Sequence, residues 1–117
     1  MKDSLQAGLA GTATHVVTAA MGAAHLPRVV LSTPSMIGLI ERVCLLTVQP
    51  HLDDGEVTVG THVCVSHQAA AGEGEEFTVT CRLTDVNRRR LTFDVQVDSA
   101  TARLSEGTHQ RAVIVPG

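Results

Sequence analysis

Aromatic side chains are almost absent from this sequence. Its 117 residues include no tryptophan and no tyrosine, and the only phenylalanines are Phe77 and Phe93. The core must therefore be built from valine, leucine, isoleucine and alanine. Positive charge is also scarce, since 9 Lys and Arg stand against 12 Asp and Glu, a net charge of −3. Nucleic-acid binders need phosphate neutralisation and often aromatic stacking platforms, so both deficits argue against a nucleic-acid partner.

Cysteine and histidine pairs with the spacing of metal or redox motifs are missing. Cys44, Cys64 and Cys81 form no CxxC, and three cysteines cannot all pair. A chain with 44% hydrophobic residues can build a core without disulfides, so we expect reduced thiols and a cytoplasmic location. His62 and His67 are five residues apart, which on a strand places them on opposite faces. We therefore expect no metal site and no cofactor. The P-loop, GxGxxG and GxSxG motifs are absent as well.

No stretch is apolar and long enough to cross a membrane, which takes about 20 mainly apolar residues. The uncharged run from Ser4 to Pro27 lacks a compact apolar centre, and Asp3 stands where a signal peptide needs basic residues. We therefore expect no membrane partner. The length fits one domain, and we expect a flexible N-terminus over residues 1–11 and a single domain over residues 12–117.

One segment predicts a long helix, from Pro34 to about Gln49. Thr33 suits the N-cap and Pro34 the first helical position, while Pro50 ends the helix. Apolar residues cover nearly every face, a pattern that predicts a helix buried all round. These residues are Met36, Ile37, Ile40, Val43, Cys44, Leu45, Leu46 and Val48.

Strand patterns flank this helix. Residues 12–19 predict a short strand before it, and residues 20–32 a connection rich in alanine and glycine. Four long strands are predicted after it, Val57–His67, Glu75–Val86, Arg90–Asp98 and about Ala102–Val115, the last with a bulge at Gly107. Alternating apolar and polar residues indicate an antiparallel sheet with one face in water. In the first of these strands the alternation predicts one core face, made of Val57, Val59, Thr61, Val63, Val65 and His67. In the second and third strands the predicted core residues are Phe77, Val79, Cys81, Leu83, Leu91, Phe93, Val95 and Val97.

These elements predict an α+β fold. An apolar helix of about 15 residues, roughly 22 Å long at 1.5 Å per residue, needs apolar cover on every side. A curved antiparallel sheet wrapped around it provides that cover, which is the hot-dog architecture. Such a sheet leaves an edge strand open, and edges are usually covered. Two copies paired edge to edge would cover it, so we expect a homodimer or a dimer of dimers.

Two side chains on these elements are candidates for chemistry. His67 ends a predicted strand on the face of Val63 and Val65. It is either a buried histidine bonded to a carbonyl or an acid–base group, since histidine titrates near neutral pH. Glu41 lies in an apolar helix, where a buried carboxylate is costly unless it is paired. It is either a structural ion pair or hydrogen bond, or a buried base or orienting group that faces a pocket.

Three further sites are of interest, and two of them have both a structural and a functional interpretation. Thr33 is an N-cap, or also a hydroxyl beside an anion site. It stands eight residues before Glu41, about 12 Å along a helix, so the two can cooperate only through a third group or from opposite subunits. Arg111 is a surface or interface arginine paired with an acid. The run Arg88–Arg90 is a solvated hairpin tip, or it holds phosphates of a nucleotide ligand.

Four blocks of this sequence resemble the hot-dog thioesterases related to fluoroacetyl-CoA thioesterase. The blocks are HLPRVVLSTPSMIGLIERVC, TVGTHVCVSHQAA, NRRRLTFDVQV and EGTHQRAVIV, in family order and with family-like spacing. The match runs over about residues 12–115. The resemblance implies an enzyme, an acyl-CoA thioesterase that acts as a homodimer on an acyl-CoA substrate. A non-catalytic dimer that binds acyl-CoA or another small ligand is the alternative, and a structural dimer with a vestigial site is a third.

The same resemblance implies roles for individual residues. Thr33, Glu41 and His67 fall on the catalytic threonine, glutamate and histidine of the family. Gly60 falls on a glycine near the thioester, and Arg111 falls on an arginine associated with substrate binding. The catalytic constellation is thus expected to combine a hydroxyl, a carboxylate and an imidazole.

The sequence departs from the fluoroacetyl-specific member of that family at two places. That member has phenylalanines in the lid before the helix, whereas residues 20–32 here contain no phenylalanine, tyrosine or tryptophan. It has a glycine in the hairpin where this chain has Arg88. The first departure predicts turnover of several short or medium acyl-CoAs, without a strong preference for fluoroacetyl-CoA over acetyl-CoA.

Overall fold

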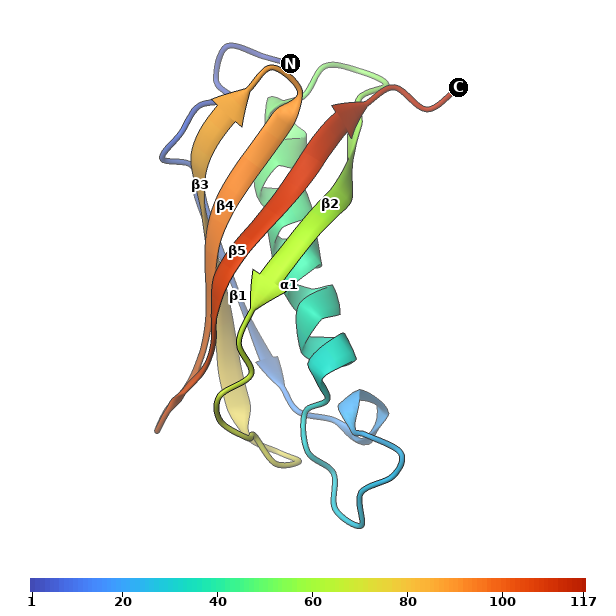
Figure 1. Ribbon diagram of the computed structural model, residues 1–117, viewed down its shortest axis with the longest axis vertical. Helices are drawn as coiled ribbons and strands as arrows, with labels where there is room; N and C mark the ends of the chain where they lie inside the picture. The colour runs from blue at the N-terminus through green and yellow to red at the C-terminus, as the bar shows by residue number, and fades with distance from the viewer.

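A computed structural model describes residues 1–117 and shows one long helix and five strands (Figure 1). In chain order these elements are β1 (Ala10–Val16), α1 (Thr33–Val48), β2 (Val57–Val65), β3 (Glu76–Asn87), β4 (Arg90–Ser99) and β5 (Arg103–Ile114). Short 3₁₀ turns lie at Ala19–Met21 and Gln49–His51. The predicted order of one strand, a helix and four strands is confirmed. No helix is long and apolar enough to span a membrane.

The five strands form one antiparallel sheet in the order β1-β3-β4-β5-β2. The sheet curves, and α1 lies along its concave face (Figure 1). This arrangement is the predicted hot-dog fold. Strands β1 and β2 are the two edges, so β2, which follows the helix in the chain, has one side free.

The central strands β3 and β4 supply most of the sheet's contribution to the core. Their inward residues, all buried as predicted, are Phe77, Val79, Cys81, Leu83, Leu91, Phe93, Val95 and Val97. Both phenylalanines are therefore used in the core, and none is left to line an exposed pocket.

Helix α1 differs from the prediction at its start and in its burial. The N-cap is Ser32, whose hydroxyl accepts the N–H of Ser35 at 3.2 Å, and Thr33 is the first helical residue. The buried residues lie toward the sheet, whereas Leu46 is 51% exposed. The prediction of a helix buried all round is wrong for a single chain, because one five-stranded sheet covers only one side of the helix.

The prediction of one core face along β2 is also wrong, because a β-bulge interrupts the strand. The register between β2 and β5 skips Thr61. Before the bulge Thr58 is buried and Val59 is 41% exposed. After it, Val63 lies opposite the buried His109 of β5. The extra residue shifts the alternation by one, so the two halves of β2 turn different sets of residues toward the helix.

The prediction of a bulge at Gly107 is wrong. The pairing of β5 runs through it without a shift, opposite Val65 on one side and Val95 on the other. A Cβ at this position would overlap the carbonyl oxygen of Cys64, so the close approach of β2 requires glycine here. The irregularity in β5 lies at Leu104 instead.

The first strand begins at Ala10, two residues before the predicted start, and ends at Val16. Upstream of it, Leu5 is buried and the Gly8 N–H donates to the carbonyl of Leu83 at 2.7 Å. The N-terminal residues therefore contact β3 in this structure.

Candidate active site

The start of α1 lies at one end of the molecule, together with the lid segment, residues 20–32, and the loop that follows β2 (Figure 1). A pocket of about 310 Å³ opens there. It is lined by Ala23, His25, Leu26, Val30, Leu31, Ser32, Thr33, Pro34 and His67. Two of the predicted catalytic residues therefore reach the same pocket.

Thr33 and His67 are in direct contact at this pocket. The Oγ1 of Thr33 lies 2.7 Å from the Nδ1 of His67. The Thr33 hydroxyl is available for this contact because Ser32 caps the helix. A hydroxyl hydrogen-bonded to a histidine nitrogen is the arrangement by which a base activates a nucleophile.

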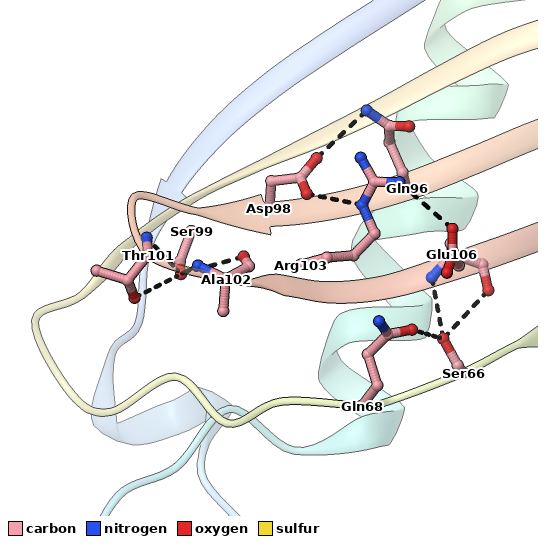
Figure 2. A network of polar contacts seen from close by, with 9 residues as sticks. All are labelled: Ser66, Gln68, Gln96, Asp98, Ser99, Thr101, Ala102, Arg103 and Glu106. Atoms are coloured by element: carbon pink, nitrogen blue, oxygen red, sulfur yellow. Dashed lines mark hydrogen bonds and ion pairs between the residues drawn. The ribbon is translucent and has the colours of Figure 1, made fainter.

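The segment that carries His67 is hydrogen-bonded to β5 on both sides of the histidine. Figure 2 shows the contacts of Ser66 with Glu106 and with Gln68. The Ser66 hydroxyl accepts the N–H of Glu106 at 3.1 Å and donates to the Gln68 side chain at 2.7 Å. The N–H groups of Ser66 and Gln68 donate to the carbonyls of Glu106 and Leu104 at 3.0 and 2.8 Å. These bonds fix the backbone around His67 even though β2 has already ended.

A second polar group lies farther along α1, beside β2 and β5. The Nη1 of Arg111 is 3.9 Å from the Oε1 of Glu41. Arg111 is only 4% exposed, so it is not a surface arginine. Within one chain the Glu41 side chain is 41% exposed, so the single chain does not bury its carboxylate. It lies on the β2 side of the helix, partly open to solvent within one chain.

Gly60 leaves room for the Glu41 carboxylate to lie beside Arg111. A Cβ at position 60 would lie 2.5 Å from the Oε1 of Glu41 and 3.4 Å from both Nη1 of Arg111 and Cε1 of His109. Three side chains therefore surround the space that any larger residue at position 60 would fill. The contacts explain why the glycine matters here without any special backbone angle.

Two residues that sequence reasoning did not assign hold Arg111 in place. Its Nε donates to the Thr58 hydroxyl at 2.8 Å, and its Nη2 donates to the Thr58 carbonyl at 3.0 Å. Its Nη1 lies 3.1 Å from the Nε2 of the fully buried His109. Burial lowers the pKa of the Arg111 guanidinium, and the charge of Glu41 opposes that shift. The sequence does contain one sign of the contact with His109. His109 and Arg111 are two residues apart on a strand, and such residues share a face.

The structure does not bring the three predicted catalytic residues together within one chain. It places Thr33 against His67, and it places Glu41 beside Gly60 and Arg111. Eight residues of helix separate Thr33 from Glu41, about 12 Å. The two groups are therefore two halves of the predicted constellation, at different points along α1.

The arginine run lies at the β3–β4 hairpin, at the end of the molecule opposite the lid (Figure 1). Arg89 pairs with Glu56 at 3.5 Å. Arg88 has a φ of +56°, in the left-handed region. Within one chain this run is therefore not part of the lid pocket, and a nucleotide-binding role for it stays a prediction.

Comparison with known proteins yields strong matches. The family model for fluoroacetyl-CoA-specific thioesterase matches residues 12–116. The fluoroacetyl-CoA thioesterase of Streptantibioticus cattleyicolor is 37% identical, over 97% of this chain and 88% of its own length. The solved structure of the fluoroacetyl-CoA thioesterase FlK superposes with a TM-score of 0.91 at 34% identity, over 97% of this chain and 90% of that one.

Two other solved structures extend the comparison. A point mutant of FlK in complex with fluoroacetate and CoA gives a TM-score of 0.90 at 34% identity, over 95% of this chain and 96% of that one. A thioesterase superfamily member from Thermus thermophilus gives 0.88 at 20% identity, over 97% and 86% of the two chains, and shares the fold.

A curved sheet around one helix, with a hydroxyl and an imidazole in contact at the helix start, defines a hot-dog protein of the thioesterase type. Within that class, the chain belongs to the fluoroacetyl-CoA-specific thioesterase family.

Proposed function

We propose that this protein is an acyl-CoA thioesterase that hydrolyses the thioester of short or medium acyl-CoAs. The observation that carries the proposal is the 2.7 Å contact between Thr33 Oγ1 and His67 Nδ1 at the pocket beneath the lid. Family membership supports it.

In this proposal His67 is the acid–base group. Its Nδ1 takes a proton from the Thr33 hydroxyl, which attacks the thioester carbonyl, or from a water that attacks directly. The C–S bond then breaks, and the thiolate of CoA receives the proton from the imidazolium. In the covalent route, water hydrolyses the acyl-threonine in a second step with the same base.

The start of α1 supports stabilisation of the oxyanion. Pro34 has no N–H, and Ser32 accepts the N–H groups of Ser35 and Met36. The N–H of Thr33 is therefore the donor that the first turn leaves for a ligand. A backbone N–H at a helix N-terminus stabilises negative charge that develops on a carbonyl oxygen.

We further propose that two chains complete the site as a homodimer or a dimer of dimers. Glu41 lies too far along α1 to reach the Thr33–His67 pair of its own chain, so it would serve the pair of the partner subunit. The free side of β2 and the exposed side chain of Val59, next to Gly60 on that strand, support an interface beside Glu41. Gly60 and Arg111 would then border the bound thioester.

The test is thiol release from a panel of acyl-CoAs that vary in acyl length. We expect release above the uncatalysed rate for several short or medium members. Binding of CoA esters without release would overturn the proposal in favour of a ligand-binding dimer, and neither binding nor release would favour a structural dimer. We also propose a cytoplasmic location, since all three cysteines are free.

A further inference from the structure

His109 lies at the centre of β5 and is fully buried. Its Nδ1 is 2.7 Å from the carbonyl oxygen of His62, next to the bulge of β2. Its Nε2 is 3.1 Å from the Nη1 of Arg111. Its ring stacks on Phe93, with 6.2 Å between the ring centroids. Both ring nitrogens and one ring face are thus occupied.

These contacts define a single protonation state of the ring. A carbonyl oxygen only accepts hydrogen bonds, so Nδ1 carries the proton and donates to His62. A guanidinium only donates, so Nε2 is unprotonated and accepts from Arg111. The ring is therefore neutral. A proton on Nε2 would place two N–H groups head to head at 3.1 Å, inside the core.

The His109 bond controls the part of Arg111 that faces the site. The two bonds to Thr58 hold Nε and Nη2. Within the protein, Nη1 makes one hydrogen bond, and its partner is His109. Nη1 is also the Arg111 atom that lies 3.9 Å from Glu41 and that borders the space at Gly60.

We infer that His109 is a positioning residue, a neutral acceptor that aims the Nη1 of Arg111 at Glu41 and at the space beside Gly60. Of the five N–H groups of the guanidinium, three are used inside the protein. The second N–H of Nη1, the atom beside Glu41 and the space at Gly60, is left for a ligand. The inference deepens the proposed thioesterase function and rests on it for the identity of that ligand.

The surroundings favour the neutral ring. Burial lowers the pKa of His109, and the Arg111 cation on β5 and His62 on β2 lower it further. The hydrogen bond to the His62 carbonyl and the charge of Glu41 on α1 oppose the shift. Phe93, on β4, carries no charge. His109 is therefore kept as an acceptor at neutral pH.

Two amides of different length separate the two bonds. In His109→Gln the longer side chain brings its amide oxygen to the place of Nε2 and keeps the bond to Arg111. In His109→Asn the shorter side chain reaches the place of Nδ1, donates to the His62 carbonyl and leaves Arg111 without its acceptor. Both remove the imidazole, so the pair distinguishes the positioning of Arg111 from support of β2.

We expect His109→Gln to keep kcat/KM for acyl-CoA within about tenfold of the parent. We expect His109→Asn to lower it by about ten- to a hundredfold more, mainly through KM, which is the range for loss of a hydrogen bond to a charged group. In an Arg111→Lys background, His109→Asn should add no further loss, because it acts through Arg111. Equal losses in the two variants, or full additivity with Arg111→Lys, would overturn the inference.

A second measurement does not depend on turnover. Nitrogen-15 NMR of the parent protein should show His109 protonated at Nδ1 and not at Nε2, and slow rotation of the Arg111 guanidinium. The slow rotation should persist in His109→Gln and be lost in His109→Asn. The opposite tautomer in the parent would refute the inference even if a variant failed to fold. Failure of the parent to release thiol would instead refute the thioesterase proposal.

Discussion

Two adjacent hydroxyls at the start of α1 have separate roles. Ser32 caps the helix, and Thr33, one residue later, contacts His67. If Thr33 were the cap, its hydroxyl would be bound to a backbone N–H of the first turn and would not be available to the imidazole. The pairing of Thr33 with His67 thus depends on which of the two hydroxyls caps the helix.

The role of His67 can be tested by removing the imidazole. Because it is the proposed acid–base group, we expect His67→Ala to lower kcat by about 10²–10⁴-fold. The half-buried side chain lies at a pocket, so the fold should survive. Circular dichroism and steady-state kinetics on the same sample provide the check. A folded variant with the turnover of the parent would exclude His67 from the mechanism.

The role of Glu41 is tested by comparing stability with activity. Its side chain is 41% exposed and 3.9 Å from Arg111, which Thr58 and His109 hold independently, so we expect loss of its charge to cost about 1 kcal/mol or less. We expect Glu41→Gln to lower thioesterase activity while the Tm changes by no more than about 4 °C. Thermal unfolding and thiol release measure the two effects. A large loss of Tm with activity intact would make Glu41 a structural residue.

At the residue scale the sequence was informative about chemistry and less so about surroundings. The structure places Thr33 against His67, whereas the sequence predicts Thr33 and not Ser32 as the cap, because either hydroxyl suits that position. His109 went unassigned, because the pattern shows its face on the strand but not the atoms that its two nitrogens meet. The catalytic roles of Thr33, Glu41 and His67 remain predictions.

At the scale of elements, the β3–β4 hairpin contains one strained residue. Arg88 has a φ of +56°, a conformation that costs an L-residue roughly 1–2 kcal/mol and costs glycine little. After allowing for the greater freedom of glycine in the unfolded chain, we expect Arg88→Gly to stabilise the protein by about 1 kcal/mol and raise its Tm by about 4 °C. Differential scanning calorimetry measures this.

Arg90→Gly is the matched control for the hairpin. Arg90 lies in β4, where a glycine costs about 0.5–1 kcal/mol of stability, so the Tm of the Arg90→Gly variant should fall. If both glycine variants lose stability to the same degree, the left-handed angle of Arg88 carries no strain.

The lid is the second element with a measurable consequence. It is tied to the loop after β2 by a bridge between Val30 and Gly72, and its pocket lining has no phenylalanine, tyrosine or tryptophan. An aromatic ring supplies a large rigid surface over an acyl group, and aliphatic residues discriminate one small substituent by only about 1–3 kcal/mol. We expect kcat/KM for fluoroacetyl-CoA and acetyl-CoA to differ little. A preference for the fluorinated ester above about a thousandfold, roughly 4 kcal/mol, would contradict this expectation. It would mean that specificity for fluoroacetyl-CoA does not need aromatic residues in the lid.

Strands were predictable where their alternation is uninterrupted. In β3 and β4 every predicted core residue is buried. In β2 the alternation is equally regular, but the bulge at Thr61 shifts it by one residue. The positions that face the helix therefore differ before and after the bulge. Threonine suits any strand position, so the residue letters contain no sign of the extra residue. The same limit explains why Gly107, required by a close contact, was taken for a bulge.

At the scale of the whole molecule, the single chain has an open side. Strand β2 is an unpaired edge, and it carries the exposed apolar side chains of Val57 and Val59. A partner that pairs with this edge would cover them. We expect light scattering after size-exclusion chromatography to give about twice the 12.3 kDa of one chain, or a multiple of that. A stable monomer at micromolar concentration would contradict a site shared between chains.

The distance along α1 between Thr33 and Glu41 has a genetic consequence. If each site takes its hydroxyl and imidazole from one chain and its carboxylate from the other, two inactive alleles complement each other. A mixed dimer of a Glu41→Gln chain and a His67→Ala chain contains one site with no lesion and one site with both. After random reassortment of equal amounts, half of the dimers are mixed, and one of the two sites in each mixed dimer is intact. About a quarter of the parental activity should therefore return when the two inactive variants are mixed. Sites contained within single chains would leave the mixture as inactive as its parts.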